Sequence, residues 1–482
     1  MALRFFNTLT RTLEDFASIE EGHVRMYTCG PTVYERPHIG NFRTFLFDDI
    51  LRRYLAWKGY QVTHVRNITD VDDNTIREAV KAGTSLHDLT EPFIAAFFED
   101  LERLGLKPAE QYPRATDYIP QMIELVERLH TRQLAYEADG SVYFDISKFP
   151  EYGRLAQLDK SEIRAGMRVS SDEAYEKQDA RDFVLWKGGE RPEEGDVAVW
   201  DSPWGPGRPG WHLECSVMAT TLLGETIDIH TGGVDLIFPH HTNEIAQSEG
   251  ACGCPFARYW LHASHLLVNN AKMSKSAGNF YTIQDLIDQG YPPSVIRRLL
   301  VSAHYRTELN FTLEGLEDAG RSVERLMELR RRLEAAPGQA SDLPATRLPE
   351  LARAALESFE EAMDDDLNVA EGWGALFVFV RDANAELDRA AGVAAEAEVT
   401  AALEAVKSMD SVFGVLDLAE REVDEVPDEL RGWIEDRLAA RARARENGDY
   451  ARADSIREEL AGAGIEIEDT PGGSRWKRAK PA

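Results

Sequence analysis

The chain has 482 residues, of which 43% are hydrophobic and 9% aromatic, so it can bury large cores and is not globally disordered. No apolar run reaches the ~18 residues of a membrane span, the first residues lack a signal-peptide cleavage site, and four Cys cannot form a disulfide scaffold. The net charge of −30 disfavours a polyanion partner, except through local patches. We expect a soluble, cytoplasmic protein of roughly three or four domains.

The first predicted elements form a strand–helix–strand unit. Residues 23–30 are predicted as a strand, the apolar spacing within residues 42–57 is helical, and residues 61–67 are predicted as a second strand. Such a unit begins a doubly wound, Rossmann-like parallel sheet, which binds its ligands after the first strand. Cys29 lies at that position.

The α/β pattern is then interrupted and resumes later in the chain. A polar segment rich in Pro and Gly precedes a predicted helix at 211–223 and a strand at 227–230. We predict an α/β fold with an insertion, followed by an α-helical bundle and a small C-terminal α+β domain. The predicted bounds are 1–118 and 204–315 for the α/β domain, 119–203 for the insertion, 316–413 for the bundle and 414–482 for the last domain.

Two polar loops have the composition of a polyphosphate site. In PHIGN, residues 37–41, Gly40 allows a ligand to approach the start of a helix, where anions are favoured, and His38 can donate to a phosphate. In KMSKS, residues 272–276, Lys272 and Lys275 are flexible cations that can follow charge developing on phosphate oxygens. The alternatives are an ordinary turn with a surface His and a solvated basic loop.

Metal-binding residue types are concentrated in one part of the chain. Nine of the 16 Cys and His residues lie between residues 212 and 265. Cys252 and Cys254 form a C-x-C pair, which offers too few ligands to complete a metal site alone. We interpret it as a buried or surface pair. The nine residues are His212, Cys215, His230, His240, His241, Cys252, Cys254, His262 and His265.

Four residues form a set of ligands suited to zinc if the fold brings them together. Cys29 ends the first strand and Cys215 lies on the helix predicted at 211–223. His240 and Glu244 are four residues apart, so they point from one face if Pro239 opens a helix. Two thiolates, an imidazole and a carboxylate are ligands that zinc accepts.

Five motifs, in this order, resemble those of cysteinyl-tRNA synthetases, which are class I aminoacyl-tRNA synthetases. The motifs are CGPTVY (29–34), HIGN (38–41), GWHLECS (210–216), FPHHTNE (238–244) and KMSKS (272–276). The resemblance extends to the ending EDTPGGSRWKR and covers essentially the whole chain. The family commonly has HHENE where Thr242 stands here, between two matched ligands. Asn41 replaces the second His of the class-wide motif, as is usual in this family.

The resemblance implies a reaction and a metal. Cysteine and ATP would give cysteinyl-adenylate and pyrophosphate, and the cysteinyl group would pass to the 3′ end of tRNA(Cys). It implies one zinc ion per chain, held by Cys29, Cys215, His240 and Glu244, with the substrate thiolate completing the coordination. Size alone separates serine from cysteine poorly, whereas zinc prefers a thiolate, so no editing domain is required.

The resemblance also assigns substrate-binding residues. His38 is expected at the phosphates, Asn41 at the nucleotide, and Lys275 at the charge that develops on the triphosphate, with Mg²⁺ bound to ATP. Asp235 is expected to face the adenosine or the amino acid. The implied ATP-binding residues are His38, Gly40, Asn41, Asp235, Lys272 and Lys275, and the implied cysteine-binding residues are Cys29, Thr69 and Trp211.

The resemblance further implies that the first domain includes a region contacting the tRNA stem and that the last domain binds the anticodon. Residues 431–482 contain 11 Lys and Arg against 10 Asp and Glu, whereas the preceding residues are strongly acidic. Trp476 could stack on an unpaired base while neighbouring cations meet phosphates. Alternatively, the arginines form i,i+4 pairs and only solvate the helices. The arginines in question are Arg437, Arg441, Arg443, Arg445, Arg452 and Arg457, and their potential partners are Glu435, Asp454 and Glu458.

Two other functions compete with this interpretation. A cysteine ligase that acylates an amino sugar would share the zinc and ATP sites, but it lacks most of the tail that follows residue 415 or so. A non-catalytic tRNA-binding relative would be expected to lose HIGN, KMSKS or the zinc ligands, and all are present. We expect a monomer without a membrane partner.

Overall fold

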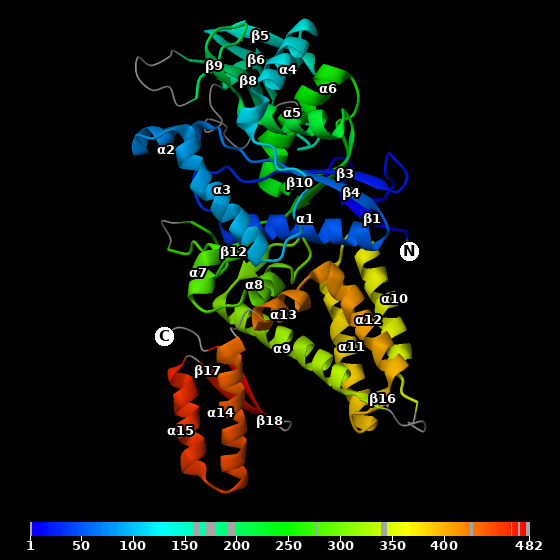
Figure 1. The fold of residues 1–482 in the computed structure, drawn as a ribbon. Coiled ribbons are helices and arrows are strands. Elements are labelled where there is room, and N and C mark those ends of the chain that lie inside the picture. The colour runs from blue at the N-terminus through cyan, green and yellow to red at the C-terminus, as the bar shows by residue number, and fades with distance from the viewer. Residues whose placement is uncertain are drawn as a thin grey trace.

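The computed structural model describes residues 2–158, 163–169, 180–189, 198–274, 278–338, 345–424, 428–463, 465–470 and 473–478. Figure 1 shows an α/β part in the upper half, a helical bundle below it, and a C-terminal helix pair beside the bundle. Among the helices of the described ranges, none combines the length and the apolar character needed to cross a membrane.

A four-stranded parallel sheet forms the centre of the α/β part. Its order is β11-β10-β3-β4, so the chain leaves β3 toward one edge and later returns to form the other half. This arrangement confirms the predicted doubly wound sheet and places a topological switch point between β3 and β10. The strands are β3 (His23–Thr28), β4 (Gln61–Arg66), β10 (Ile227–Gly233) and β11 (Ala257–Ala263).

Helix α1 (Ile39–Trp57) connects β3 to β4 and confirms the helix predicted at 42–57. It starts three residues earlier because His38 and Asn41 close a capping box: Nδ1 of His38 accepts from the Asn41 amide at 3.1 Å, and Oδ1 of Asn41 accepts from the His38 amide at 3.0 Å. The buried face of α1, with Phe42 and Leu46, belongs to the largest hydrophobic core.

A second sheet lies between the two halves of the parallel sheet in sequence. Helix α4 (Ile119–Thr131) precedes this sheet, and strand β6 (Ser141–Phe144) pairs with both β5 and β8. The buried ring of Phe144 stacks on Phe183 of β8 at 5.0 Å. The other strands are β5 (Ala135–Ala138), β7 (Ile163–Val169), β8 (Ala180–Gly188) and β9 (Gly207–Pro209), and the sequence did not predict β7, β8 or β9.

Smaller elements frame the α/β part. A three-stranded sheet of order β13-β12-β14 follows β11 and leads into the KMSKS segment. The short hairpin at the N-terminus packs against β11. These elements are β1 (Arg4–Asn7), β2 (Thr12–Asp15), α2 (Asp73–Ala82), α3 (Leu86–Arg103), β12 (Leu266–Val268), β13 (Ala271–Lys272), β14 (Leu309–Phe311), α7 (Ile283–Asp288) and α8 (Pro293–Leu300).

The helical bundle shares its core with α1. Trp373 stacks on Phe413 at 3.7 Å, and buried residues of the bundle continue into the core beneath the parallel sheet. The predicted α-helical bundle is present here, and three of its helices lie between residues 348 and 413. The bundle and its flanks contain α9 (Leu313–Ala335), α10 (Leu348–Asp364), α11 (Val369–Arg389), α12 (Glu396–Phe413) and α13 (Leu416–Asp424), with the short strands β15 (Pro337–Gly338) and β16 (Ala394–Ala395).

Three consecutive carboxylates join the bundle to the α/β part at the turn between α10 and α11. Each binds a different element, so the turn is held from several sides. Asp366 has a φ of 59°, in the left-handed region that Asp tolerates better than most residues. The three contacts are Asp364 with the Tyr54 hydroxyl of α1 at 2.7 Å, Asp365 with Arg4 of β1 at 2.7 Å, and Asp366 with the Tyr305 hydroxyl at 2.6 Å.

The C-terminal unit consists of α14 (Asp428–Glu446), α15 (Tyr450–Gly462) and a hairpin of β17 (Ile465–Thr470) and β18 (Gly473–Arg478), as predicted. It has a separate small core of Ile434, Ile456, Leu460 and Ile465. In the described part of the chain, none of the proposed i,i+4 ion pairs is present, and Arg437 pairs instead with Glu459 at 3.0 Å. The side chain of Trp476 lies outside the described residues.

Candidate active site and metal centre

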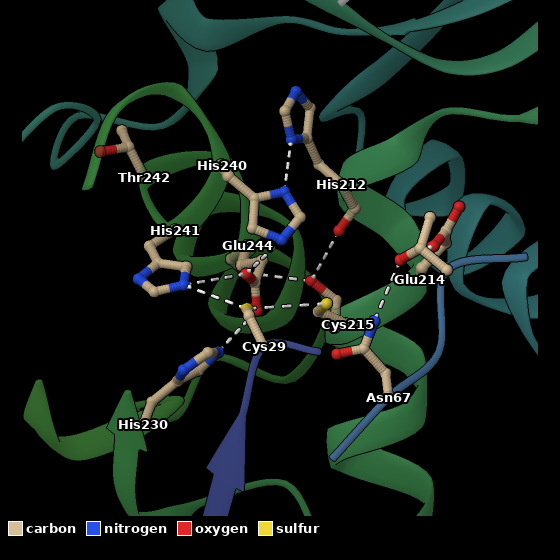
Figure 2. A network of polar contacts seen from close by, with 12 residues as sticks. Cys29, Asn67, His212, Glu214, Cys215, His230, His240, His241, Thr242 and Glu244 are labelled. Atoms are coloured by element: carbon tan, nitrogen blue, oxygen red, sulfur yellow. Dashed lines mark hydrogen bonds and ion pairs between the residues drawn. The ribbon is translucent and has the colours of Figure 1, made fainter. Parts of the chain in front are cut away.

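The predicted metal ligands meet at the carboxyl edge of the parallel sheet. Cys29 directly follows β3, Cys215 lies on α5 (Trp211–Leu223), and His240 and Glu244 follow β10. One potential ligand atom from each of the four buried residues lies within 4.8 Å of the others. Figure 2 shows these side chains converging from separate elements. The switch point of the sheet thus brings together residues separated by up to 215 positions in the chain.

The segment before α6 (Thr242–Cys252) agrees with the expected geometry. Phe238 is extended, and the backbone that follows it is helical and continues into α6, so Pro239 stands at the start of the helical run. His240 therefore faces Glu244, and its Nε2 lies 3.1 Å from Oε1 of Glu244. The hydroxyl of Thr242 donates to the Ile237 carbonyl at 2.7 Å, so this residue stabilises the turn and leaves the ligands untouched.

The donor set fits a thiophilic metal ion. The sulfurs of Cys29 and Cys215 lie 3.9 Å apart, and Oε1 of Glu244 is buried but accepts no hydrogen bond. Burial raises the pKa of the Cys29 thiol well above its usual value and lowers the pKa of His240 well below it. His240 is therefore neutral and able to act as a ligand, and an incoming cation would displace the thiol proton.

Further histidines surround the four predicted ligands. Together with Cys29 and Glu244, His230 and His241 form an alternative ligand set within 4.8 Å. Nε2 of His230 lies 2.9 Å from Oε2 of Glu244, and Nε2 of His241 lies 3.3 Å from the Cys29 sulfur. His241 in turn contacts His262, with 2.8 Å between the ring nitrogens. Burial lowers the pKa of both His241 and His262 well below the usual value.

These histidines were noted in the sequence only as members of a dense cluster. Their positions on β10 and β11 and in the turn before α6 bring them to one edge of the sheet, and their density was the only sequence signal for that role.

Trp211 lies against a predicted ligand. Its ring stacks on His240 with 4.2 Å between ring centroids. The neighbouring His212 also contacts this ring, with 3.0 Å between Nδ1 of His212 and Nδ1 of His240. A side-chain amide of Gln247 donates to the His212 carbonyl at 2.7 Å and fixes the start of α5. Trp211 and His212 together therefore orient the imidazole of His240.

Thr69 and Glu214 form a buried pair beside Cys215. Thr69 follows β4, and its hydroxyl donates to Oε2 of Glu214 at 3.0 Å. Burial raises the pKa of Glu214 well above its usual value, and the neighbouring Cys215 adds to this effect. Sequence reasoning assigned Thr69 to the amino-acid pocket but missed Glu214, although Glu214 lies within the motif GWHLECS.

Gly30 is required for the close approach of two loops after β3 and β4. Its amide donates to Oδ1 of Asn67 at 2.8 Å. A β-carbon at this position would lie only 1.7 Å from the Asn67 carbonyl oxygen. The short contact excludes any larger residue next to Cys29.

The two predicted ATP motifs are neighbours. A β-carbon on Gly40 would lie 2.9 Å from the His38 ring and 3.3 Å from the terminal methyl of Met273, so the HIGN turn contacts the KMSKS segment. Lys272 is exposed on β13 and Asp235 is exposed in the turn after β10, whereas Lys275 lies outside the described residues. His38 and Asn41 engage each other in the capping box.

An amide organises the start of the KMSKS loop. Oδ1 of Asn279 accepts from the Ser274 amide at 2.8 Å, and its Nδ2 donates to the Lys272 carbonyl at 3.2 Å. Asn279 follows the motif by three residues and was not assigned a role from the sequence. Its side chain joins the two ends of the loop.

Comparison with known families covers three parts of the chain. Residues 15–321 match the family described as class I (C) tRNA synthetase catalytic domains. Residues 358–417 match the DALR domain, and residues 428–476 match the anticodon-binding domain of cysteinyl-tRNA ligase.

Similar proteins include the cysteine–tRNA ligase of Solibacter usitatus, which is 50% identical over 99% of this chain and 100% of that protein. The cysteine–tRNA ligase of Chlamydia felis is 46% identical, over 99% of this chain and 98% of its own length. A methionyl-tRNA synthetase structure from Mycobacterium tuberculosis, bound by methionyl-adenylate, has a TM-score of 0.57 at 15% identity, covering 82% of this chain and 90% of that one. The last match concerns the fold alone. The chain belongs to the family of cysteine–tRNA ligases, within class I of the aminoacyl-tRNA synthetases.

Proposed function

We propose that the protein activates cysteine with ATP and transfers the cysteinyl group to the 3′ end of tRNA(Cys). The observation that carries the proposal is the buried convergence of Cys29, Cys215, His240 and Glu244 at the switch point of a class I sheet. Two thiols in a ligand set are suited to selecting a sulfur-containing substrate by way of a soft metal.

The four ligands would hold one zinc ion. Zinc, when bound, accepts a thiolate as a further ligand far more readily than a serine hydroxyl. The chain itself supplies a neutral imidazole at His240, a carboxylate at Glu244, and the stacked ring of Trp211, which keeps water from His240. Thr69, paired with Glu214, would line the amino-acid pocket.

ATP would bind across the contact between HIGN and KMSKS. His38 at the start of α1 is assigned to the phosphates and Asn41 to the nucleotide, with Mg²⁺ carried by ATP. The capping box holds both side chains in the free protein, so ATP must compete with it or use their remaining donors. Lys272 and Lys275 are assigned to the triphosphate, where their charge would oppose the negative charge that develops as pyrophosphate leaves.

The C-terminal unit supports tRNA as the acceptor. Its match to an anticodon-binding domain disfavours the ligase that acylates an amino sugar, which lacks most of this tail. The metal ligands and both ATP motifs are retained, which disfavours a non-catalytic tRNA-binding protein.

The deciding experiment is ATP–pyrophosphate exchange with each of the 20 amino acids. We expect fast exchange with cysteine alone, and exchange with serine at least tenfold slower. Charging of a tRNA(Cys) transcript then separates the synthetase from the amino-sugar ligase. Exchange with serine as fast as with cysteine would refute metal-based selection, and absent charging would refute the tRNA step.

A further inference from the structure

Cys252 and Cys254 lie on the surface at the end of α6, apart from the metal centre. Gly253 between them has a φ of 80°, a left-handed conformation that glycine adopts readily. The resulting turn brings the two Cα atoms to 5.4 Å, and a disulfide joins the sulfurs. Both side chains are partly exposed, whereas Cys29 and Cys215 are buried. Reagents in solution can therefore reach this pair selectively.

The Cys252 sulfur has a hydrogen-bond donor that can stabilise its thiolate form. The amide of Cys254 donates to this sulfur at 2.9 Å, and the protonated thiol can donate to the Cys254 carbonyl at 3.1 Å. The guanidinium of Arg132 donates to the Ala251 carbonyl at 2.7 Å and lies 3.4 Å from the position of a β-carbon on Gly253. Amide donors and nearby cations stabilise a thiolate, which is the nucleophile in thiol–disulfide exchange.

The surroundings of Cys254 differ. Its sulfur lies 3.8 Å from Oε2 of Glu225, and the Glu225 carboxylate pairs with Arg128 at 3.1 Å. A carboxylate favours the protonated thiol, which can donate to it. The pair is therefore asymmetric, with Cys252 suited to attack a disulfide and Cys254 suited to resolve the product.

We propose that Cys252 and Cys254 are a reversible dithiol–disulfide pair that reacts with low-molecular-weight disulfides. The Cys252 thiolate attacks one sulfur of the small disulfide, which breaks its S–S bond and releases one thiolate. Cys254 loses its proton and attacks the Cys252 sulfur, which releases the second thiolate and forms the protein disulfide. The protein loses two electrons and two protons, and the small disulfide becomes two thiols.

This chemistry has a consequence that rests on the proposed function. When the small disulfide is cystine, the two thiols released are cysteine, the proposed substrate. The pair would then be oxidised under the same conditions that remove free cysteine from the cell. The pair lies at the end of α6, the helix that carries Glu244. Oxidation of the cysteine pool would therefore change the covalent state of a helix that also contributes to the active site.

The test uses the full-length protein, reduced and then equilibrated in buffers with different ratios of glutathione to glutathione disulfide. Free thiols are alkylated under native conditions, and mass spectrometry quantifies the peptide that contains Cys252 and Cys254. We expect both thiols to disappear together in one two-electron transition. The ratio of oxidised to reduced protein should change tenfold for each change of about 30 mV in the potential of the glutathione buffer. The buried Cys29 and Cys215 should resist alkylation throughout. Two thiols that stay alkylatable at every ratio would overturn the proposal.

Variants test the roles of the two sulfurs. Cys254→Ser should accumulate a mixed disulfide at Cys252, and Cys252→Ser should react about tenfold more slowly than Cys254→Ser because its remaining thiol lacks the stabilising contacts. Arg132→Met should slow oxidation of the wild-type pair, whereas Arg321→Met, on the distant helix α9, should not. A mixed disulfide that persists in the wild-type protein, or equal rates in both serine variants, would refute the assigned roles.

A metal site is the competing outcome. The two sulfurs and Glu225 each offer one ligand atom within 4.8 Å of the others, so the reduced pair could bind zinc instead. A second equivalent of zinc that is absent from Cys254→Ser and that protects both thiols from glutathione disulfide would overturn the redox assignment. Cysteine-dependent pyrophosphate exchange, unchanged in both serine variants, shows that they fold and keeps this result separate from the proposed function.

Discussion

Replacing exposed arginines of the C-terminal helix pair should weaken tRNA binding without slowing cysteine activation. The unit has its own core, and the HIGN, KMSKS and metal-ligand motifs all lie before residue 280. The arginines are exposed and stand within the match to an anticodon-binding domain. The proposed variant changes Arg443, Arg445, Arg452 and Arg457 to Gln.

The expected magnitude follows from counterion release. Each phosphate that an arginine neutralises contributes about 0.7–0.9 to the slope of log K against log salt, so the loss of four contacts should flatten that slope by about 3. A fourfold rise in salt weakens tRNA binding by both proteins. The factor by which it weakens binding should be about 60-fold smaller for the variant than for the wild-type protein. The Michaelis constant for tRNA should rise, while cysteine-dependent pyrophosphate exchange stays unchanged.

The assay is tRNA binding by fluorescence anisotropy at four or more salt concentrations, combined with charging kinetics. The matched control removes the same charge from exposed positions outside the C-terminal unit, with Arg321, Arg347, Arg353 and Arg381 changed to Gln. An equal loss of slope in both variants would refute the reasoning, because net charge alone would then explain it. An unchanged Michaelis constant for tRNA in the C-terminal variant would show that this unit is not the anticodon reader.

Three further predictions concern the metal, the chemistry and the fold. Cys215→Ser should lose metal and cysteine activation while Cys252→Ser keeps both, and full zinc in the Cys215 variant by elemental analysis would contradict the ligand assignment. Lys275→Ala should lower kcat for adenylate formation by a factor of about 10²–10³, with a smaller effect on KM for ATP. An unchanged kcat in pyrophosphate exchange would show that Lys275 does not stabilise the transition state. Tyr54→Phe removes a 2.7 Å hydrogen bond to the buried carboxylate of Asp364 and should lower the free energy of unfolding by about 1.5–3 kcal/mol in a urea titration; no loss would show that another donor replaces it.

The sequence was most informative where local patterns and chemistry coincide. The helix at Trp211–Leu223 has the predicted bounds, because a glycine precedes it and another follows it. The strand at 23–30 ends close to the structural end of β3, and Cys29 lies at the sheet edge that the βαβ pattern indicates. Parallel-sheet topology then makes distant residues converge, so the ligand set could be proposed before the structure.

Other features depend on contacts that no local pattern encodes. Strand β9 consists of Gly207–Pro209, a composition typical of loops, and it forms because it pairs with β8. The kink at Phe238, where the backbone is extended just before the helical run that carries His240, has no local signal in the sequence. The contacts among the further histidines depend on the spacing of β10 and β11, which periodicity does not reveal.

Helix α1 connects the HIGN residues at its start with the helical bundle at its end. Its 19 residues span about 28 Å, with the HIGN residues in the first turn and Tyr54, bound to Asp364 of the bundle, in the last. A rotation of about 2° around the bundle end would displace the first turn by about 1 Å, a shift comparable to the positional tolerance of catalysis. A small rearrangement of the bundle would therefore be transmitted through α1 to the HIGN residues.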